Sequence, residues 1–275
     1  MRALGVALLL CACSRDAPPP AASEDARGPR AGEIAIPMPA VAAGEVAIWQ
    51  REGSLETRGR MFHRGNFRGN VSWTGTRKSA IRAETLAVSA GRPSRLRLTY
   101  SAHATTALVG GVRRAIGPAL EGRSYLVELG AGEPQVSLEG GGVIGAAESE
   151  RVSLDVLDFE LRWRPVQGRT LLIGETVNGA TPLVLKSARA GLARITTRAR
   201  VNVGSGLGAP VEAEVDAEAV IDLATGRVRE LRDGGVASLT GTRVEGVKNA
   251  ELGGTAAWTG TGLVSPPVEA SASSH

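Results

Sequence analysis

Apolar and polar residues alternate along much of the chain between about residues 45 and 266. The clearest runs are 95–100, 197–203 and 211–219, in which every second residue is apolar and most of the others are charged or polar. A period of two places these classes on opposite faces of a β-strand. One apolar and one charged face is typical of an antiparallel sheet with one side covered. We therefore expect a mainly β fold, as an antiparallel, strongly curved sheet or a half-open barrel or sandwich.

The alternation also predicts how two strands pair. Strands 193–203 and 211–222 are joined by a glycine-rich loop, and one antiparallel register places arginines opposite carboxylates on the polar face. A slip of one residue would mix the two faces. The opposing pairs in the favoured register are Val203 with Val211, Arg200 with Glu214, Ala199 with Val215, and Arg198 with Asp216.

One segment has helical rather than strand periodicity. Val152, Val156 and Phe159 share one face of a helix predicted over 146–159, and acidic residues fill its first turn. Asp155 and Asp158 lie three residues apart on the same helix. Such a pair can serve a glycosidase, but we expect these carboxylates to lie on the solvated helix face.

The first residues predict export. One early arginine, a short apolar run and small residues are typical of a secretory signal peptide, and the run is shorter than the ~20 residues that span a bilayer. Leu10-Cys11-Ala12-Cys13 resembles the bacterial lipobox. The resemblance implies cleavage before Cys13 and lipidation of Cys13. Both cysteines of the chain lie in this motif, so the processed protein would contain no disulfide.

Composition divides the rest of the chain into segments. Residues 13–44 are rich in proline and alanine, which predicts the lipidated cysteine and a disordered, partly polyproline tether. Within it, Glu33–Ile36 could form a short strand against the domain. We expect a signal peptide over 1–12, the β domain over 45–266, and a disordered tail over 267–275.

Charge is unevenly divided along the chain. Residues 51–114 hold 13 basic and three acidic side chains, a net charge of +10, whereas residues 115–275 have a net charge of −5. The basic half could face anionic lipid phosphates, or the two halves could neutralise each other within the fold. We favour neutralisation. Nucleic acid is not expected as a partner, because no basic platform with interleaved aromatic residues is present.

The chain offers little material for catalysis. The histidines are His63, His103 and His275, no two of them have the spacing of metal ligands, and both cysteines lie in the lipobox. We interpret His63 and His103 as isolated surface residues, and predict no metal, no cofactor and no catalytic residue. Trp49, Trp73, Trp163 and Trp258 are expected to anchor the core. Small inward residues such as Ala199, Ala213, Ala217 and Ala219 would leave either a cavity or closely packed sheets.

Three further segments complete the pattern. They are Gly-Arg-Ser-Tyr-Leu-Val at 122–127, Gly-Arg-Thr-Leu-Leu-Ile-Gly-Glu at 168–175 and Ile-Asp-Leu-Ala-Thr-Gly-Arg at 221–227, and they accompany the lipobox, the tether, the basic strands and the single acidic helix. This layout resembles β-rich lipoproteins of high-GC Gram-negative bacteria. The resemblance implies a lipid-anchored protein of the bacterial cell envelope, facing the periplasm or the cell surface, and it transfers no site residues.

Three functions remain open at this stage. The first is a non-catalytic structural or partner-binding domain, with an envelope protein as the partner. The second is a carrier or sensor of an apolar or lipid ligand in a cavity of the sheet, and the third is a hydrolase. An apolar cavity that side chains do not fill would favour the carrier, and a packed interior would favour the structural domain.

Overall fold

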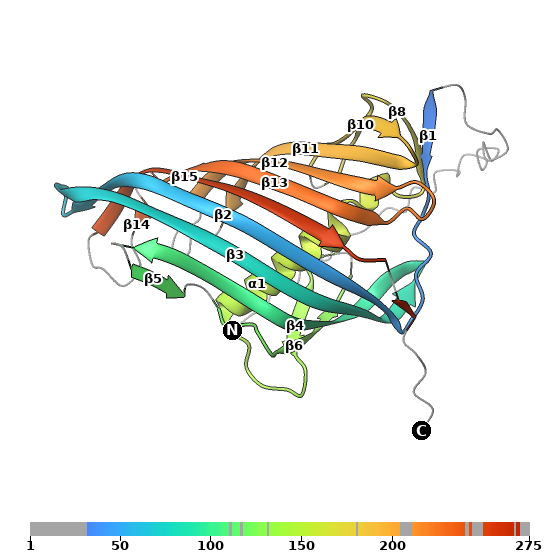
Figure 1. Cartoon of the computed structure of the whole chain (residues 1–275), viewed down its shortest axis with the longest axis horizontal. Helices are drawn as coiled ribbons and strands as arrows, with labels where there is room; N and C mark the ends of the chain where they lie inside the picture. Colours follow the sequence, from blue (N-terminus) through green and yellow to red (C-terminus); the bar gives the residue numbers. More distant parts are fainter. Residues whose placement is uncertain are drawn as a thin grey trace, which may run out of the picture.

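The computed structural model describes residues 32–109, 112–115, 118–130, 132–179, 181–203, 211–239, 242–243, 250–266 and 268–269. Most of them form one antiparallel sheet of 14 strands that does not close on itself. The main path of this sheet runs β7-β6-β4-β3-β2-β15-β13-β12-β11-β10-β9, so β7 and β9 are its edges. The sheet curves strongly around a helix (Figure 1). The expected fold class is therefore confirmed.

The strands of the large sheet are β2 (Glu45–His63), β3 (Asn66–Ser89), β4 (Arg92–Val109), β5 (Val112–Ala115), β6 (Ser124–Glu128), β7 (Gln135–Leu138), β9 (Thr176–Val177), β10 (Leu183–Arg189), β11 (Leu192–Val203), β12 (Val211–Asp222), β13 (Val228–Ser238), β14 (Thr242–Arg243), β15 (Ala250–Val264) and β16 (Val268–Glu269). A separate two-stranded sheet consists of β1 (Glu33–Ile36) and β8 (Arg169–Leu172).

The register predicted from charge and apolar alternation is confirmed. In β11 and β12, Arg198 lies opposite Asp216 and Arg200 opposite Glu214. The apolar face of these strands turns inward, because Ala213, Ala217 and Ala219 are buried. The hydrophobic pattern and the charge pattern select the same register, as expected where one face of a sheet is covered.

The predicted helix lies in the hollow of the sheet (Figure 1). It consists of α1 (Ala146–Val156), which continues as the π-helical turn η1 (Leu157–Leu161), followed by the 3₁₀ turn η2 (Arg164–Val166). Its three apolar anchors, Val152, Val156 and Phe159, are all buried, as the helical periodicity predicted. Glu148 at the start of the helix accepts hydrogen bonds from the Tyr125 hydroxyl and from Arg123, and a carboxylate stabilises this end of a helix dipole.

The largest hydrophobic cluster lies between the helix and the concave face of the sheet. It includes Tyr100 and Tyr125 from the strands and Trp163 from beyond η1. Trp49 and Trp163 are core residues as expected. Gly262 allows the helix to approach, since a Cβ atom there would lie 3.1 Å from Phe159.

The described strands reach beyond both bounds of the predicted β domain. Glu33–Ile36, which the sequence allowed as a short strand within the tether, forms β1 and pairs with β8 in the register Glu33 with Leu172. At the other end, Val268–Glu269 forms β16 against β2, two residues inside the predicted tail. Residues 1–31 lie outside the described part of the chain, and with them the predicted signal peptide, Cys13 and most of the tether.

Candidate functional site

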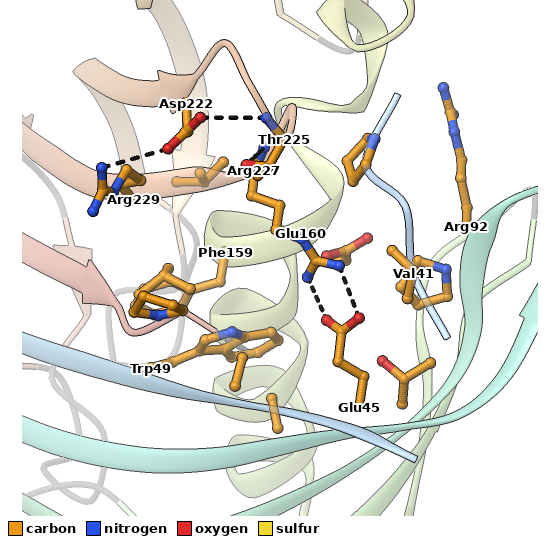
Figure 2. Close-up of a pocket in the computed structure, with 18 of the residues that line it drawn as sticks. Val41, Glu45, Trp49, Arg92, Phe159, Glu160, Asp222, Thr225, Arg227 and Arg229 are labelled. Atoms are coloured by element: carbon orange, nitrogen blue, oxygen red, sulfur yellow. Dashed lines mark hydrogen bonds and ion pairs between the residues drawn. The ribbon is translucent and has the colours of Figure 1, made fainter. Parts of the chain in front are cut away.

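A cavity of about 190 Å³ opens between the concave face of the sheet and the C-terminal end of the helix. Figure 2 shows the residues around it, which come mainly from β2, β3, β4, β13, β15, η1, the β12–β13 turn and the segment that leads into β2. Many of the lining side chains are apolar. These are Pro39, Val41, Ala47, Trp49, Ala83, Pro93, Leu96, Phe159, Val228, Val264 and Pro266.

A stacked aromatic pair forms one wall of the cavity. The ring centroids of Trp49 and Phe159 lie 5.1 Å apart with an angle of 14° between the ring planes. Trp49 comes from the sheet and Phe159 from η1, so the stack joins the helix to the sheet. Close to it, the Trp163 indole N–H donates to the carbonyl oxygen of Asp158 at 2.8 Å, which fixes the turn after the helix.

Charged side chains surround the apolar lining. Arg227 forms an ion pair with Glu45 (Figure 2). It also donates to the carbonyl oxygen of Ala40. Asp222 pairs with Arg229 at 3.4 Å, and its carboxylate accepts from backbone N–H groups of the β12–β13 turn. Apolar walls with a charged rim are the usual composition of a site for a molecule with an apolar body and a polar end.

Next to the cavity, the helix contacts the sheet through buried charges. Asp155 on α1 is fully buried. Its carboxylate accepts from Arg77 at 2.6 Å, from Arg151 at 2.7 Å and from the Tyr100 hydroxyl at 2.9 Å. Burial alone would raise the pKa of Asp155, but the charges of Arg151 and Arg77 lower it well below its ordinary value. Asp155 is therefore an anion locked between the helix and the sheet.

A second cluster repeats this arrangement one turn further along. Asp158 forms an ion pair with Arg51 on β2 and another with Arg162 at 2.7 Å. Arg51 also contacts Asp233 on β13 at 2.7 Å. Burial would lower the pKa of Arg51, but the two carboxylates raise it well above its ordinary value. We call the eight residues of both clusters the ionic clamp: Arg51, Arg77, Tyr100, Arg151, Asp155, Asp158, Arg162 and Asp233.

The clamp corrects one expectation. Asp155 and Asp158 are not on a solvated helix face, because both point into the sheet and meet arginines there. Their pKa values lie below the ordinary range, whereas a glycosidase acid requires a raised pKa. Charges from the basic and acidic halves of the sequence meet here, as in the pairs of Arg51 and Arg77 with the helix. At these positions the two halves neutralise each other within the fold.

The expectation that His103 lies on the surface is also wrong, because its side chain is buried. Its ring makes an edge contact with Tyr100, with centroids 5.7 Å apart. Among the described residues, neither ring nitrogen has a hydrogen-bond partner, and the neighbouring Ser79 hydroxyl has none either. Burial lowers the pKa of His103, and the charge of Arg77 lowers it further. Both effects favour the neutral form of the His103 ring. His63, in contrast, is only partly buried.

A second hollow, of about 650 Å³, lies over β10–β13. Half of its lining residues are charged, among them Lys186, Arg198 and Glu218. It is also more open to solvent than the first cavity, so it would enclose a ligand less completely. The cavity beneath the helix is thus the better candidate site.

The sequence and the structure agree only in part on this site. The sequence singled out Trp49 and the helix, and both line the cavity. It missed Glu45 and Arg227, which lie 182 residues apart along the chain and meet only in the fold. Within the described residues, no group of three or more His, Cys, Asp or Glu side chains could hold a metal ion. No described helix is both long enough and apolar enough to cross a membrane.

Comparisons with known proteins add little. No protein-family model matches the chain, and no curated protein matches it. A solved structure described as "Lipid-protein interactions in lipovitellin" aligns with a TM-score of 0.47 at 7% sequence identity, over 85% of this chain and 26% of that one. The chain therefore spans about a quarter of that structure's length, and at this TM-score the likeness is too weak to assign a fold or a function.

Proposed function

We propose that the chain is a non-catalytic cell-envelope protein that binds an apolar molecule, such as an acyl chain, between its helix and its sheet. The observation that carries the proposal is the apolar cavity walled by Trp49 and Phe159. Its charged rim, with Arg227 and Arg229, suits a ligand that has an apolar body and a polar or anionic end.

The size of the cavity implies that the helix moves when a ligand binds. Pockets that bury small ligands measure roughly 300–1,000 Å³, whereas this cavity measures about 190 Å³. The sheet is an extensively hydrogen-bonded framework and resists expansion. The segment from α1 to η1 is the element whose displacement would enlarge the space against Ala47 and Ala83.

The helix is held both by apolar contacts and by the ionic clamp. Displacement exposes Val152, Val156 and Phe159 to water, at about 25 cal/mol per Å². The side chains of Asp155 and Arg77 are hydrated on separation, and this hydration offsets much of their lost attraction. The clamp therefore defines the closed position of the helix, and ligand binding has to offset the cost of exposing the apolar face of the helix.

The anchoring part of the proposal rests on the lipobox resemblance at Cys13. Lipidation there would place the domain at a membrane surface through the tether, with stable attachment by more than one acyl chain. Replacing Cys13 by Ala should move the protein from the membrane fraction to the soluble fraction. Retention of Cys13→Ala with salt-washed membranes would contradict lipid anchoring at this residue.

A packed interior supports the second candidate, a structural or partner-binding domain. The core cluster beneath the helix includes fully buried Tyr100, Tyr125 and Trp163, and the cavity is small. In this alternative the helix never leaves the sheet and the cavity is a packing defect. The two candidates differ in whether the purified protein binds an apolar ligand.

Titration with a fluorescent fatty acid tests the proposal. We expect saturable binding, and we expect Val41→Trp, which fills the mouth of the cavity, to weaken it by about tenfold, or about 1.4 kcal/mol. Ala104→Phe, an added bulky residue at an exposed position of β4, is the matched control and should leave binding unchanged. No saturable binding, or equal effects of both variants, would contradict the ligand site and leave the structural role.

A further inference from the structure

The hairpin between β2 and β3 extends beyond its neighbour β4. The last pair of β3 with β4 joins Trp73 to Val109 at the level of Thr57. From there β2 continues to His63, which adds roughly 20 Å of hairpin at 3.3 Å per residue. This end forms the far tip of the molecule in Figure 1. We call it the basic tip and define it as Arg58, Arg60, Phe62, Arg64, Phe67 and Arg68.

The charge of the basic tip is almost all of one sign. No acidic residue occurs between Glu56 and Glu84 in the sequence. Arg60, Arg64 and Arg68 are exposed, and among the described residues none of them forms an ion pair. The acidic groups nearby are Glu56, which pairs with Arg58, and Glu251, which lies opposite Phe62 on β15.

An exposed aromatic residue lies among these arginines, although no basic surface with interleaved aromatic residues was expected from the sequence. Phe67 is 56% exposed, more than any other described aromatic residue. It meets Phe62 edge to face, with ring centroids 6.1 Å apart. The turn beside it is tight, since Arg64 and Gly65 both have positive φ angles of 51° and 76°, as in a type I′ hairpin. Phe67 is thus held outward by a short, well-defined hairpin.

We propose that the basic tip docks on an anionic phospholipid bilayer. Arginines near such a surface are attracted by its negative potential, and an exposed phenylalanine can bury its ring at the boundary between headgroups and acyl chains. The arginines and Phe67 would therefore contact the same region of the bilayer surface.

The tip is separate from the proposed ligand cavity and from the entry of the tether. Fourteen residues of β2 separate Trp49 in the cavity from His63 at the tip, about 46 Å of strand. β1, which follows the tether, lies at the opposite end of the molecule from the hairpin (Figure 1). A docked tip would therefore give the protein a membrane contact that depends neither on Cys13 nor on a ligand in the cavity.

Co-sedimentation with vesicles tests this proposal. The chain from residue 14 onward keeps every described residue and lacks both cysteines, so lipidation cannot contribute. It should bind vesicles that contain phosphatidylglycerol, and bind vesicles of pure phosphatidylcholine weakly. Added salt should reduce binding, since it screens exposed charges.

A matched pair of double variants locates the contact. Arg64→Asn with Arg68→Gln should weaken binding to anionic vesicles by about 30-fold, because each arginine contributes about fivefold. Arg198→Gln with Arg200→Gln removes the same charge from the outer face of β11 and should change binding little. Equal losses in both variants, or no loss in the tip variant, would overturn the proposal.

A fluorescent label at residue 67 tests whether this position enters the bilayer. Phe67→Cys, labelled with an environment-sensitive dye, should shift its emission to the blue on anionic vesicles, whereas a label at Arg198→Cys should not. Absence of a shift at residue 67, or binding to single-stranded nucleic acid but not to vesicles, would overturn the membrane assignment. Failure of the fatty-acid titration would leave these results unaffected, so the two proposals can fail independently.

Discussion

Arginine–carboxylate pairs occur in two very different regions of this molecule. On the outer face, Arg198 pairs with Asp216 and Arg200 with Glu214, and all four side chains are largely exposed. Under the helix, Arg77 and Arg51 pair with Asp155 and Asp158, where Asp155 is fully buried. The outer pairs stabilise a register that alternation already determines. The inner pairs hold one element against another, so the same chemistry differs greatly in its effect on stability.

The largest effect is expected for the buried pair. Asp155→Ala would leave Arg77 and Arg151 without their shared anion, and removing one partner of a buried pair typically costs about 3–5 kcal/mol. Denaturation by urea of the wild type and the variant measures this loss. A change below about 1 kcal/mol would show that the clamp is as weak as a surface pair.

A double replacement separates charge from packing in the same place. Asp155→Leu combined with Arg77→Met removes the two charges of this pair and retains apolar volume, while Arg151 remains partly exposed to solvent. Because hydrophobic replacement of a buried pair is often neutral or stabilising, we expect the double variant to be more stable than Asp155→Ala. If its unfolding free energy is equal to or lower than that of the single variant, apolar packing cannot replace the charge pair, and the pairing itself holds the helix.

The next effect is a pH dependence caused by His103. An unfolded histidine titrates near pH 6.5, and burial lowers the pKa of His103 in the folded state. The unfolded state therefore binds more protons below pH 6.5. The contribution of the neutral ring to stability is complete above that pH and is lost as the pH falls through it, by at most about 1.4 kcal/mol per unit.

The groups facing His103 sharpen this test. Arg77 and Arg151 oppose its protonation, while Asp155 and Glu121 favour it. The carboxylates of the clamp have lowered pKa values, so their contribution is present above about pH 4 and is lost only below it. Urea unfolding between pH 7 and pH 5 should therefore show a decline that disappears in His103→Gln. A decline of equal size in both proteins would assign it to other groups.

The smallest effect belongs to the outer face. Glu214→Arg replaces attraction by repulsion opposite Arg200, but solvent screens the pair. We expect a loss of at most about 1 kcal/mol in the same unfolding assay. A loss as large as that of Asp155→Ala would remove the contrast between the two regions.

The sequence predicted a region well where the relevant pattern lies within one segment or two neighbouring strands. The pairing of Arg198 with Asp216 follows from two neighbouring strands of clear alternation. The burial of Val152 and Phe159 follows from helical periodicity in one segment. The predictions that failed, at Asp155, Asp158 and His103, concern polar residues whose partners come from distant strands. Periodicity assigns such residues to the solvent, because it contains no information on which element covers them.

The cavity could not be predicted from the sequence for the same reason. Sequence reasoning left a lined cavity and a packed interior open, since alanines such as Ala217 and Ala219 fit both. Its lining joins residues from Pro39 to Pro266, and no local pattern links them. The tether was only partly predicted, since β1 pairs with a strand more than 130 residues away.

One measurement tests the central claim that the helix is a movable cover over an apolar ligand site. Spin labels at Leu154→Cys, exposed on α1, and Arg198→Cys, exposed on β11, report the distance between the helix and the sheet in a chain from residue 14 that contains no other cysteine. We predict that saturating palmitate shifts the distance distribution to longer values. An unchanged distribution at saturating palmitate would contradict the account and leave the helix as a fixed part of the core.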